Sequence, residues 1–167
     1  MGGKADGLPL LFMRPTPHEL PDLGFRSPSA ASSVPQSEWP DRVRASDDLC
    51  VVDSEAYFIR GVLELPVLDH DERFGIGAWV SQKPDNFWQY AEHFDDDGDL
   101  APTFGWLSND FVFQGVSSLN LKTTVHFQGD GSRPQIVLHK ADHPLVVAQQ
   151  NGVTLDEVWA FLHQHLD

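Results

Sequence analysis

Cationic and polar side chains on the predicted strands are the residues of this chain best suited to bind a ligand. Arg60 shares a strand face with Glu64, and Lys122 shares one with Thr124 and His126. Guanidinium and ammonium groups on a sheet of an acidic protein either pair with its own carboxylates or bind an anionic ligand. The candidate binding residues are Arg60, Arg73, Trp106, Asn109, Lys122, His126 and His143.

Two interpretations of these candidates remain open. A solvated or ion-paired sheet face is the simpler one. Trp106 fits a core position as well as a pocket wall, and His143, which precedes Pro144, fits a helix N-cap, as does Asp142. The other interpretation is a pocket that binds an anion. Its residues are Arg60, Arg73, Asn109, Lys122 and His126.

The motifs predict no metal, no cofactor and no recognisable catalytic centre. If Gly98 takes the sixth position of an EF-hand loop, His93 and Phe104 fall on its first and last ligand positions, where neither fits. His163 and His165 are two apart on a predicted helix and point to different sides. A nucleophile elbow, a phosphate-binding glycine loop and a dinucleotide fingerprint are all missing from the sequence.

Composition and charge exclude several classes of function. The chain has 25 Asp and Glu against 11 Lys and Arg, a net charge of −14, and it is 41% hydrophobic. Such a surface repels nucleic-acid backbones and anionic lipids but attracts basic proteins. The single cysteine, Cys50, cannot form an intrachain disulfide. With no apolar run long enough for a membrane span and no secretory segment, we expect a cytoplasmic location.

The hydrophobic pattern predicts strands followed by helices. Alternation is clearest at Ala56–Leu65 and at Leu119–Phe127, and the second of these forms a hairpin with Pro134–Lys140. Further strands are predicted at 49–53, 73–81 and 103–109. Helices are predicted near 38–44, from Pro84 to about Phe94, from Pro144 to Asn151, and after the capping box Thr154–Glu157.

This order predicts an α+β fold rather than a doubly wound one. We expect a mainly antiparallel sheet of about five to six strands packed against three to four helices. Residues 1–18 are rich in Gly and Pro and predict a flexible tail. Residues 19–167 form the single predicted domain, a length that buries an ordinary core.

Several short segments, in order along the chain, are similar to a bacterial family of uncharacterised proteins, domain of unknown function 2199. They are Leu20–Phe25, Asp48–Asp53, Phe58–Leu63, Asp71–Gly75, Ala78–Ser81, Phe104–Leu107, Leu121–Thr123 and Asp142–Leu145. The resemblance brings no activity, because none is established for the family. Members typically begin with a CxxC pair, where this chain has Leu10 and Met13. Any function of that pair is therefore expected to be missing here.

We predict a non-catalytic binding or interaction domain whose acidic surface covers a basic partner, as in immunity or antitoxin-like proteins. The evidence for this prediction is the charge. The alternative is a small-molecule enzyme or ligand-binding domain with an anion-accepting pocket on the sheet.

Overall fold

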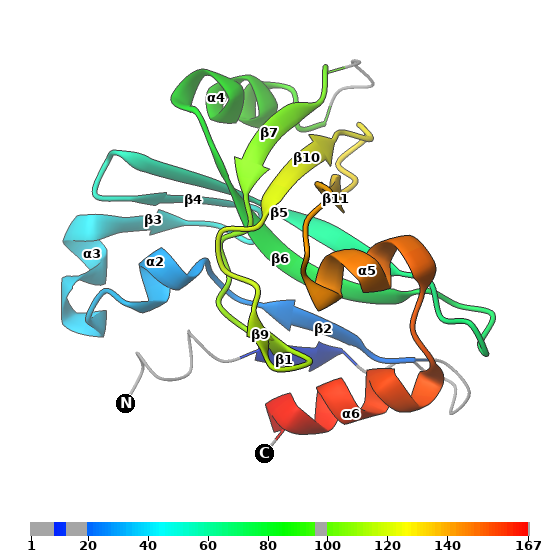
Figure 1. The fold of residues 1–167 in the computed structure, drawn as a ribbon. Coiled ribbons are helices and arrows are strands. Elements are labelled where there is room, and N and C mark those ends of the chain that lie inside the picture. The colour runs from blue at the N-terminus through cyan, green and yellow to red at the C-terminus, as the bar shows by residue number, and fades with distance from the viewer. Residues whose placement is uncertain (1–8, 13–19, 96–99, 167) are drawn as a thin grey trace.

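A curved mixed sheet forms the body of the protein, with helices packed around it (Figure 1). The computed structural model describes residues 9–12, 20–95 and 100–166. The strands of the sheet are β1 (Pro9–Phe12), β2 (Asp22–Phe25), β3 (Val43–Ala45), β4 (Leu49–Val52), β5 (Ala56–Leu65), β6 (Phe74–Gln82), β7 (Thr103–Trp106), β10 (Lys122–His126) and β11 (Gln135–Leu138). A separate hairpin pairs β8 (Val112–Phe113) with β9 (Val116–Ser117).

Helices cover the sheet at several places (Figure 1). They are α2 (Ser29–Ser32), the 3₁₀ helix η1 (Gln36–Glu38), α3 (Trp39–Arg42), α4 (Pro84–Glu92), α5 (Pro144–Asn151) and α6 (Leu155–Leu166). In Figure 1, helix α4 lies beside the upper part of β7, α5 lies in front of β5 and β6, and α6 lies below β1 and β2.

The predicted α+β class is confirmed, but the predicted sheet was too small and too uniform. The described strands form a nine-stranded sheet in the order β1-β2-β6-β5-β11-β10-β7, with β3 and β4 attached beside β5. Two of its pairs, β2–β6 and β11–β5, are parallel. The described residues also form five α-helices, more than the predicted three to four. Strands and helices of only three or four residues are too short to show a hydrophobic period, which explains why β2, β3 and α2 were missed.

The sheet closes on itself where the end of β7 returns to β6. Val80 and Leu107 form an antiparallel bridge there. Next to it the Ser108 amide donates to the Trp79 carbonyl at 2.8 Å, and the Trp79 amide donates to the Asn109 side-chain oxygen at 2.8 Å. Strands β6, β5, β11, β10 and β7 therefore surround a shared interior.

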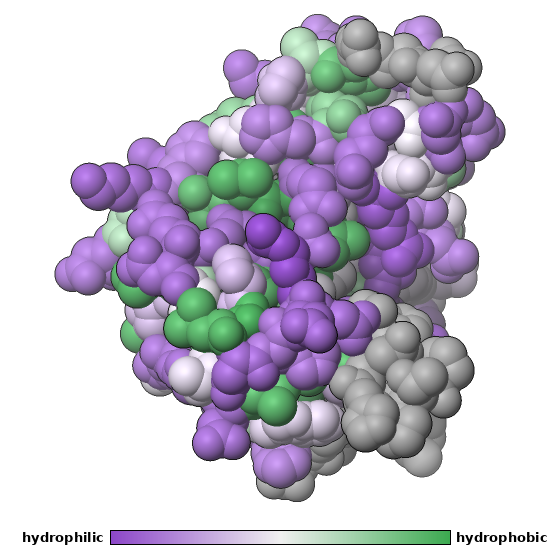
Figure 2. Space-filling view, turned by 90° about the vertical axis from the view of Figure 1, so that its right-hand side faces the viewer, coloured by the Kyte–Doolittle hydropathy of each residue, from purple (hydrophilic) through white to green (hydrophobic). Residues whose placement is uncertain are grey.

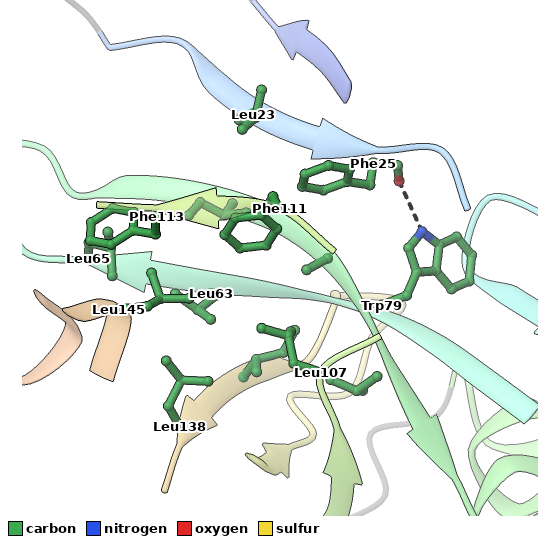
Figure 3. Close-up of a cluster of buried hydrophobic side chains, with 14 of the residues drawn as sticks. Leu23, Phe25, Leu63, Leu65, Trp79, Leu107, Phe111, Phe113, Leu138 and Leu145 are labelled. Atoms are coloured by element: carbon green, nitrogen blue, oxygen red, sulfur yellow. Dashed lines mark hydrogen bonds between the residues drawn. The ribbon is translucent and has the colours of Figure 1, made fainter. Parts of the chain in front are cut away.

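The hydrophobic core fills this interior and continues under α5 and α6 (Figure 3). Leu63 and Leu65 on β5 are fully buried on this inner face, as strand alternation predicts. Phe161 of α6 packs edge-on against Phe74, with ring centroids 6.1 Å apart. Trp79 faces the opposite, outer side of the sheet and donates its ring N–H to the Phe25 carbonyl at 2.9 Å.

The long predicted elements are confirmed with small changes at their ends. Strand β5 spans Ala56–Leu65 as predicted, and the predicted hairpin of Leu119–Phe127 with Pro134–Lys140 is the antiparallel pair β10–β11. Pro9–Phe12, within the predicted tail, pair with β2 as β1. Residues 1–8 and 13–18 of that tail lie outside the described residues, and the predicted domain boundary stays a prediction.

The predicted capping box begins α6. The Glu157 amide donates to the Thr154 hydroxyl at 3.2 Å, and the Thr154 amide donates to the Glu157 carboxylate at 2.9 Å. We expect Thr154→Ala to lower the free energy of unfolding by about 1 kcal/mol. Urea denaturation measures the change. Thr154→Ser keeps the hydroxyl and is the control; an equal loss in that variant would contradict the capping role.

His165 links stability to pH. Its ring packs against Phe161 with centroids 4.6 Å apart, and its Nε2 is buried without a hydrogen-bond partner among the described groups. Burial lowers the pKa of His165, while a hydrogen bond with the Val112 backbone opposes this shift. As pH falls through about 6.5, the unfolded chain therefore takes up this proton before the folded one does.

The free energy of unfolding should accordingly fall below about pH 6.5, and the contribution of His165 should level off below its lowered folded pKa. His165→Phe should flatten this part of the profile, as measured by urea denaturation at a series of pH values. His163→Phe, at an exposed position on the same helix, is the control. If both variants keep the full slope, His165 is not its source.

No helix in the described part of the chain combines the length and the apolar character needed to cross a membrane.

Candidate functional site

A cavity of about 270 Å³ opens on the outer face of β2, β6 and β5, the face opposite α5 and α6. Its lining contains no hydroxyl, thiol or imidazole from the described residues. The lining residues are Asp22, Leu23, Gly24, Arg60, Val62, Glu64, Arg73, Gly75, Gly77 and Arg133. We call it the arginine cavity.

Glycines form the floor of the arginine cavity. Gly77 stands in register between Gly24 of β2 and Val62 of β5. A Cβ atom on Gly77 would lie 3.5 Å from the Gly24 Cα and 3.9 Å from Arg60 Nε. The missing side chains leave the backbone of two neighbouring strands exposed to the cavity, so a ligand can approach it closely.

Arg60 is the most unusual group of the cavity, because it is only 7% exposed. Its Nη1 donates to the Asp47 carbonyl at 3.1 Å, and the guanidinium carbon lies 5.7 Å from the centre of the Trp79 ring. Its Nε is buried without a hydrogen-bond partner in the described structure. A buried donor in this state costs free energy that an acceptor in the cavity would recover.

Electrostatics at Arg60 favour a negatively charged neighbour. Burial lowers the pKa of Arg60, and the positive charge of Arg133 lowers it further, while Asp48 and Asp47 oppose the shift. Arg133 itself donates to the Asp48 carboxylate at 2.9 Å. The remaining guanidinium, Arg73, is exposed and has no ion pair among the described residues.

Two carboxylates share the cavity with the three guanidiniums. Glu64 is in register with Gly75, and a Cβ on Gly75 would lie 3.1 Å from Asp22 Oδ1. Three guanidiniums and two carboxylates therefore line the cavity, and the charge of one guanidinium, Arg133, is offset by its ion pair with Asp48.

The other candidates do not line this cavity. Lys122 and Trp106 lie side by side on β10 and β7, with the ammonium 5.9 Å from the ring centre. His126 lies on β10 and is exposed. The predicted convergence of five residues is therefore limited to Arg60 and Arg73.

Asn109 and His143 make structural hydrogen bonds. Asn109 accepts from Trp79 and donates its side-chain amide to the Ser27 carbonyl at 2.9 Å, which fixes the closure of the sheet. His143 Nδ1 accepts from the Leu145 amide at 3.0 Å, so its Nε2 carries the proton and donates to the Ser117 carbonyl at 2.8 Å. This confirms His143 as the N-cap of α5.

Elsewhere the surface offers shallower features. A more open hollow of about 530 Å³ lies beside Trp106, Phe58 and Leu119. On the side of the molecule in Figure 2, hydrophobic residues form separate patches among hydrophilic ones. Within the described residues no group of three or more His, Cys, Asp or Glu side chains is arranged to hold a metal ion.

Three polar lining residues were missing from the sequence-based candidates: Asp22, Glu64 and Arg133. The sequence pattern places Glu64 on the same strand face as Arg60 but does not assign it to the site. Asp22 is half-buried and is followed by three buried residues, Leu23, Gly24 and Phe25. A strand of four residues with this burial shows no alternation that would predict it. Arg133 reaches the cavity through the parallel contact of Gln135 with Val62, which no local pattern predicts.

Comparison with known proteins identifies a family. No curated protein and no solved structure matches the chain. The sequence pattern of DUF2199, described as an uncharacterised protein conserved in bacteria, matches residues 15–153. This range includes every lining residue of the arginine cavity. The chain therefore belongs to the DUF2199 family of uncharacterised bacterial proteins.

Proposed function

We propose that this protein is a non-catalytic binding domain whose ligand is a small anion held in the arginine cavity. The observation that carries the proposal is the buried Nε of Arg60, a residue of the cavity lining. This atom has no partner among the described groups and would lie 3.9 Å from a Cβ atom on Gly77 of the cavity floor. A carboxylate or phosphate oxygen is the acceptor that a guanidinium binds most strongly. The proposed class is binding rather than group transfer, because the described lining offers carboxylates but no hydroxyl, thiol or imidazole.

The volume and position of the cavity agree with a small ligand. About 270 Å³ lies just below the usual range of small-molecule sites, so the ligand has few non-hydrogen atoms. Arg60 lies on β5, Arg133 lies just before β11, which pairs with β5, and Arg73 immediately precedes β6. An anion close to Arg60 would also offset the repulsion between Arg60 and Arg133.

Titration calorimetry with inorganic phosphate and with pentanoate, at low ionic strength, tests the proposal. The expected result is saturable binding of at least one of these anions. Gly77→Ala should weaken it by about tenfold, because the added methyl group occupies the cavity floor beside Arg60 Nε. Since that methyl group makes only ordinary contacts with β2, the fold should remain intact.

Lys122→Gln is the matched control, because it removes one positive charge from the outer face without touching the cavity. It should leave binding almost unchanged. Binding of neither anion would contradict the proposal, and so would an equal loss of affinity in both variants, which would indicate nonspecific attraction to positive charge.

A second candidate function is favoured by the net charge of −14. An acidic domain associates rapidly with a basic protein, and such association weakens steeply with salt. Capture of partners from a bacterial lysate at low and high salt tests this candidate. Partners that are no more basic than the proteome would contradict it.

A further inference from the structure

The arginine cavity separates positive from negative groups along β6, and this separation restricts the ligand further. A Cβ on Gly77 would meet Arg60 Nε at 3.9 Å, whereas a Cβ on Gly75 would meet Asp22 Oδ1 at 3.1 Å. These two glycines are two residues apart on one strand face, which is about 6–7 Å. The basic and acidic groups therefore stand over neighbouring positions of the cavity floor.

The acidic position holds two carboxylates from different strands. Gly75 is the cross-strand partner of Glu64 on β5, and Asp22 approaches Gly75 from β2. Both carboxylates line the cavity. A second anionic group on the ligand would lie against them and be repelled. An ammonium group there would instead gain charge-assisted hydrogen bonds.

The positive charge of Arg73 does not make the cavity suitable for a ligand with two anionic groups. Gly75 and Gly77 share one face of β6, and Arg73 immediately precedes this strand. The acidic position beside Gly75 therefore lies between Arg73 and the Arg60 end. A dianion that bridged Arg73 and Arg60 would have to pass Asp22 and Glu64. Because Arg133 is already paired with Asp48 and two carboxylates line the cavity, the cavity suits one anionic group rather than two.

Resting on the proposed function, we infer that the ligand is zwitterionic: a small molecule whose carboxylate binds Arg60 and whose ammonium group binds Glu64 and Asp22. The two charged groups of this ligand are separated by a short extended chain. Amino acids with the amine at the far end of the chain have this chemistry. Val62, between Arg60 and Glu64 on the same strand face, provides an apolar contact for the methylene groups.

Three linear carboxylates of equal chain length test the inference by titration calorimetry. They are 5-aminopentanoate, pentanoate and glutarate. We expect 5-aminopentanoate to bind the full chain about tenfold more tightly than either of the others, since only its ammonium group donates charge-assisted hydrogen bonds to Glu64 and Asp22. Glu64→Gln should reduce this preference while still binding pentanoate.

Asp22→Asn repeats the measurement from the other strand, and thermal unfolding of each variant verifies that it is folded. If glutarate binds as tightly as 5-aminopentanoate, or if the preference survives in both variants, the zwitterion inference is wrong and anion binding stands. If neither these carboxylates nor phosphate bind the unmodified chain, the proposed function itself fails.

Discussion

Arg60→Gln should abolish most of the anion affinity while leaving the protein folded. Removal of a buried charged donor from a bound anion weakens binding by about 2–5 kcal/mol, which is about 30-fold or more in Kd. The Nε of Arg60 has no partner among the described groups, so its loss breaks no protein hydrogen bond at that atom. Within the described residues, the contacts at risk are the hydrogen bond of Nη1 to the Asp47 carbonyl and the stacking of the guanidinium on Trp79.

A measurement of stability distinguishes a role of Arg60 in binding from a role in folding. A buried charge that is incompletely paired contributes little to stability. The free energy of unfolding of Arg60→Gln without ligand should therefore lie within about 1 kcal/mol of the wild-type value. Calorimetry gives the affinity, and urea denaturation without ligand gives the stability. Unchanged affinity in a folded Arg60→Gln protein would contradict the assignment. Lys122→Gln is again the matched change of charge.

Gly105→Ala should be the most destabilising of the single substitutions considered. A Cβ on Gly105 would overlap the backbone carbonyl oxygen of Ser81 and would lie 3.3 Å from the Val80 Cβ. This contact stands where the Val80–Leu107 bridge closes the sheet, so relief requires a shift of β6 or β7. Overpacking of this kind costs about 3 kcal/mol, and urea denaturation measures it.

Gly77→Ala is the matched control for this change, because Gly77 lies on the same strand β6 as Ser81. The nearest contact of its new methyl group is an ordinary one, 3.5 Å from the Gly24 Cα. We expect stability within about 1 kcal/mol of the wild type in that variant. If Gly105→Ala is equally mild, β7 does not pack against β6 as closely as described.

Sequence patterns within a single long strand or at a helix end correctly predicted which residues are buried and which residues cap a helix. The alternation of β5 places Ile59, Leu63 and Leu65 inside and Arg60 and Glu64 outside, as the burial of the first three shows. The capping box of α6 and the histidine cap of α5 follow from short motifs with a direct hydrogen-bonding reason. These features needed no knowledge of the rest of the chain.

Pairing between distant segments could not be predicted in the same way. Strand β2 has only four residues, and its parallel pairing with β6 joins segments about fifty residues apart. The same holds for Arg133, which reaches Arg60 because β11 pairs with β5. Four of the ten lining residues, which are Asp22, Leu23, Gly24 and Arg133, therefore depend on long-range contacts. Asn109 was predicted to bind a ligand, but it is buried and its side chain forms hydrogen bonds with the backbone of Trp79 and Ser27 instead.

The Nε–H resonance of Arg60, observed by ¹H–¹⁵N NMR, gives the decisive test of the arginine cavity. The resonance is assigned by its disappearance in Arg60→Lys, and phosphate and 5-aminopentanoate are then added stepwise. We predict a saturable shift of this resonance at the same ligand concentrations that saturate calorimetric binding. A resonance that stays in place while both ligands bind would show that the anion is held elsewhere, and would contradict the proposed site.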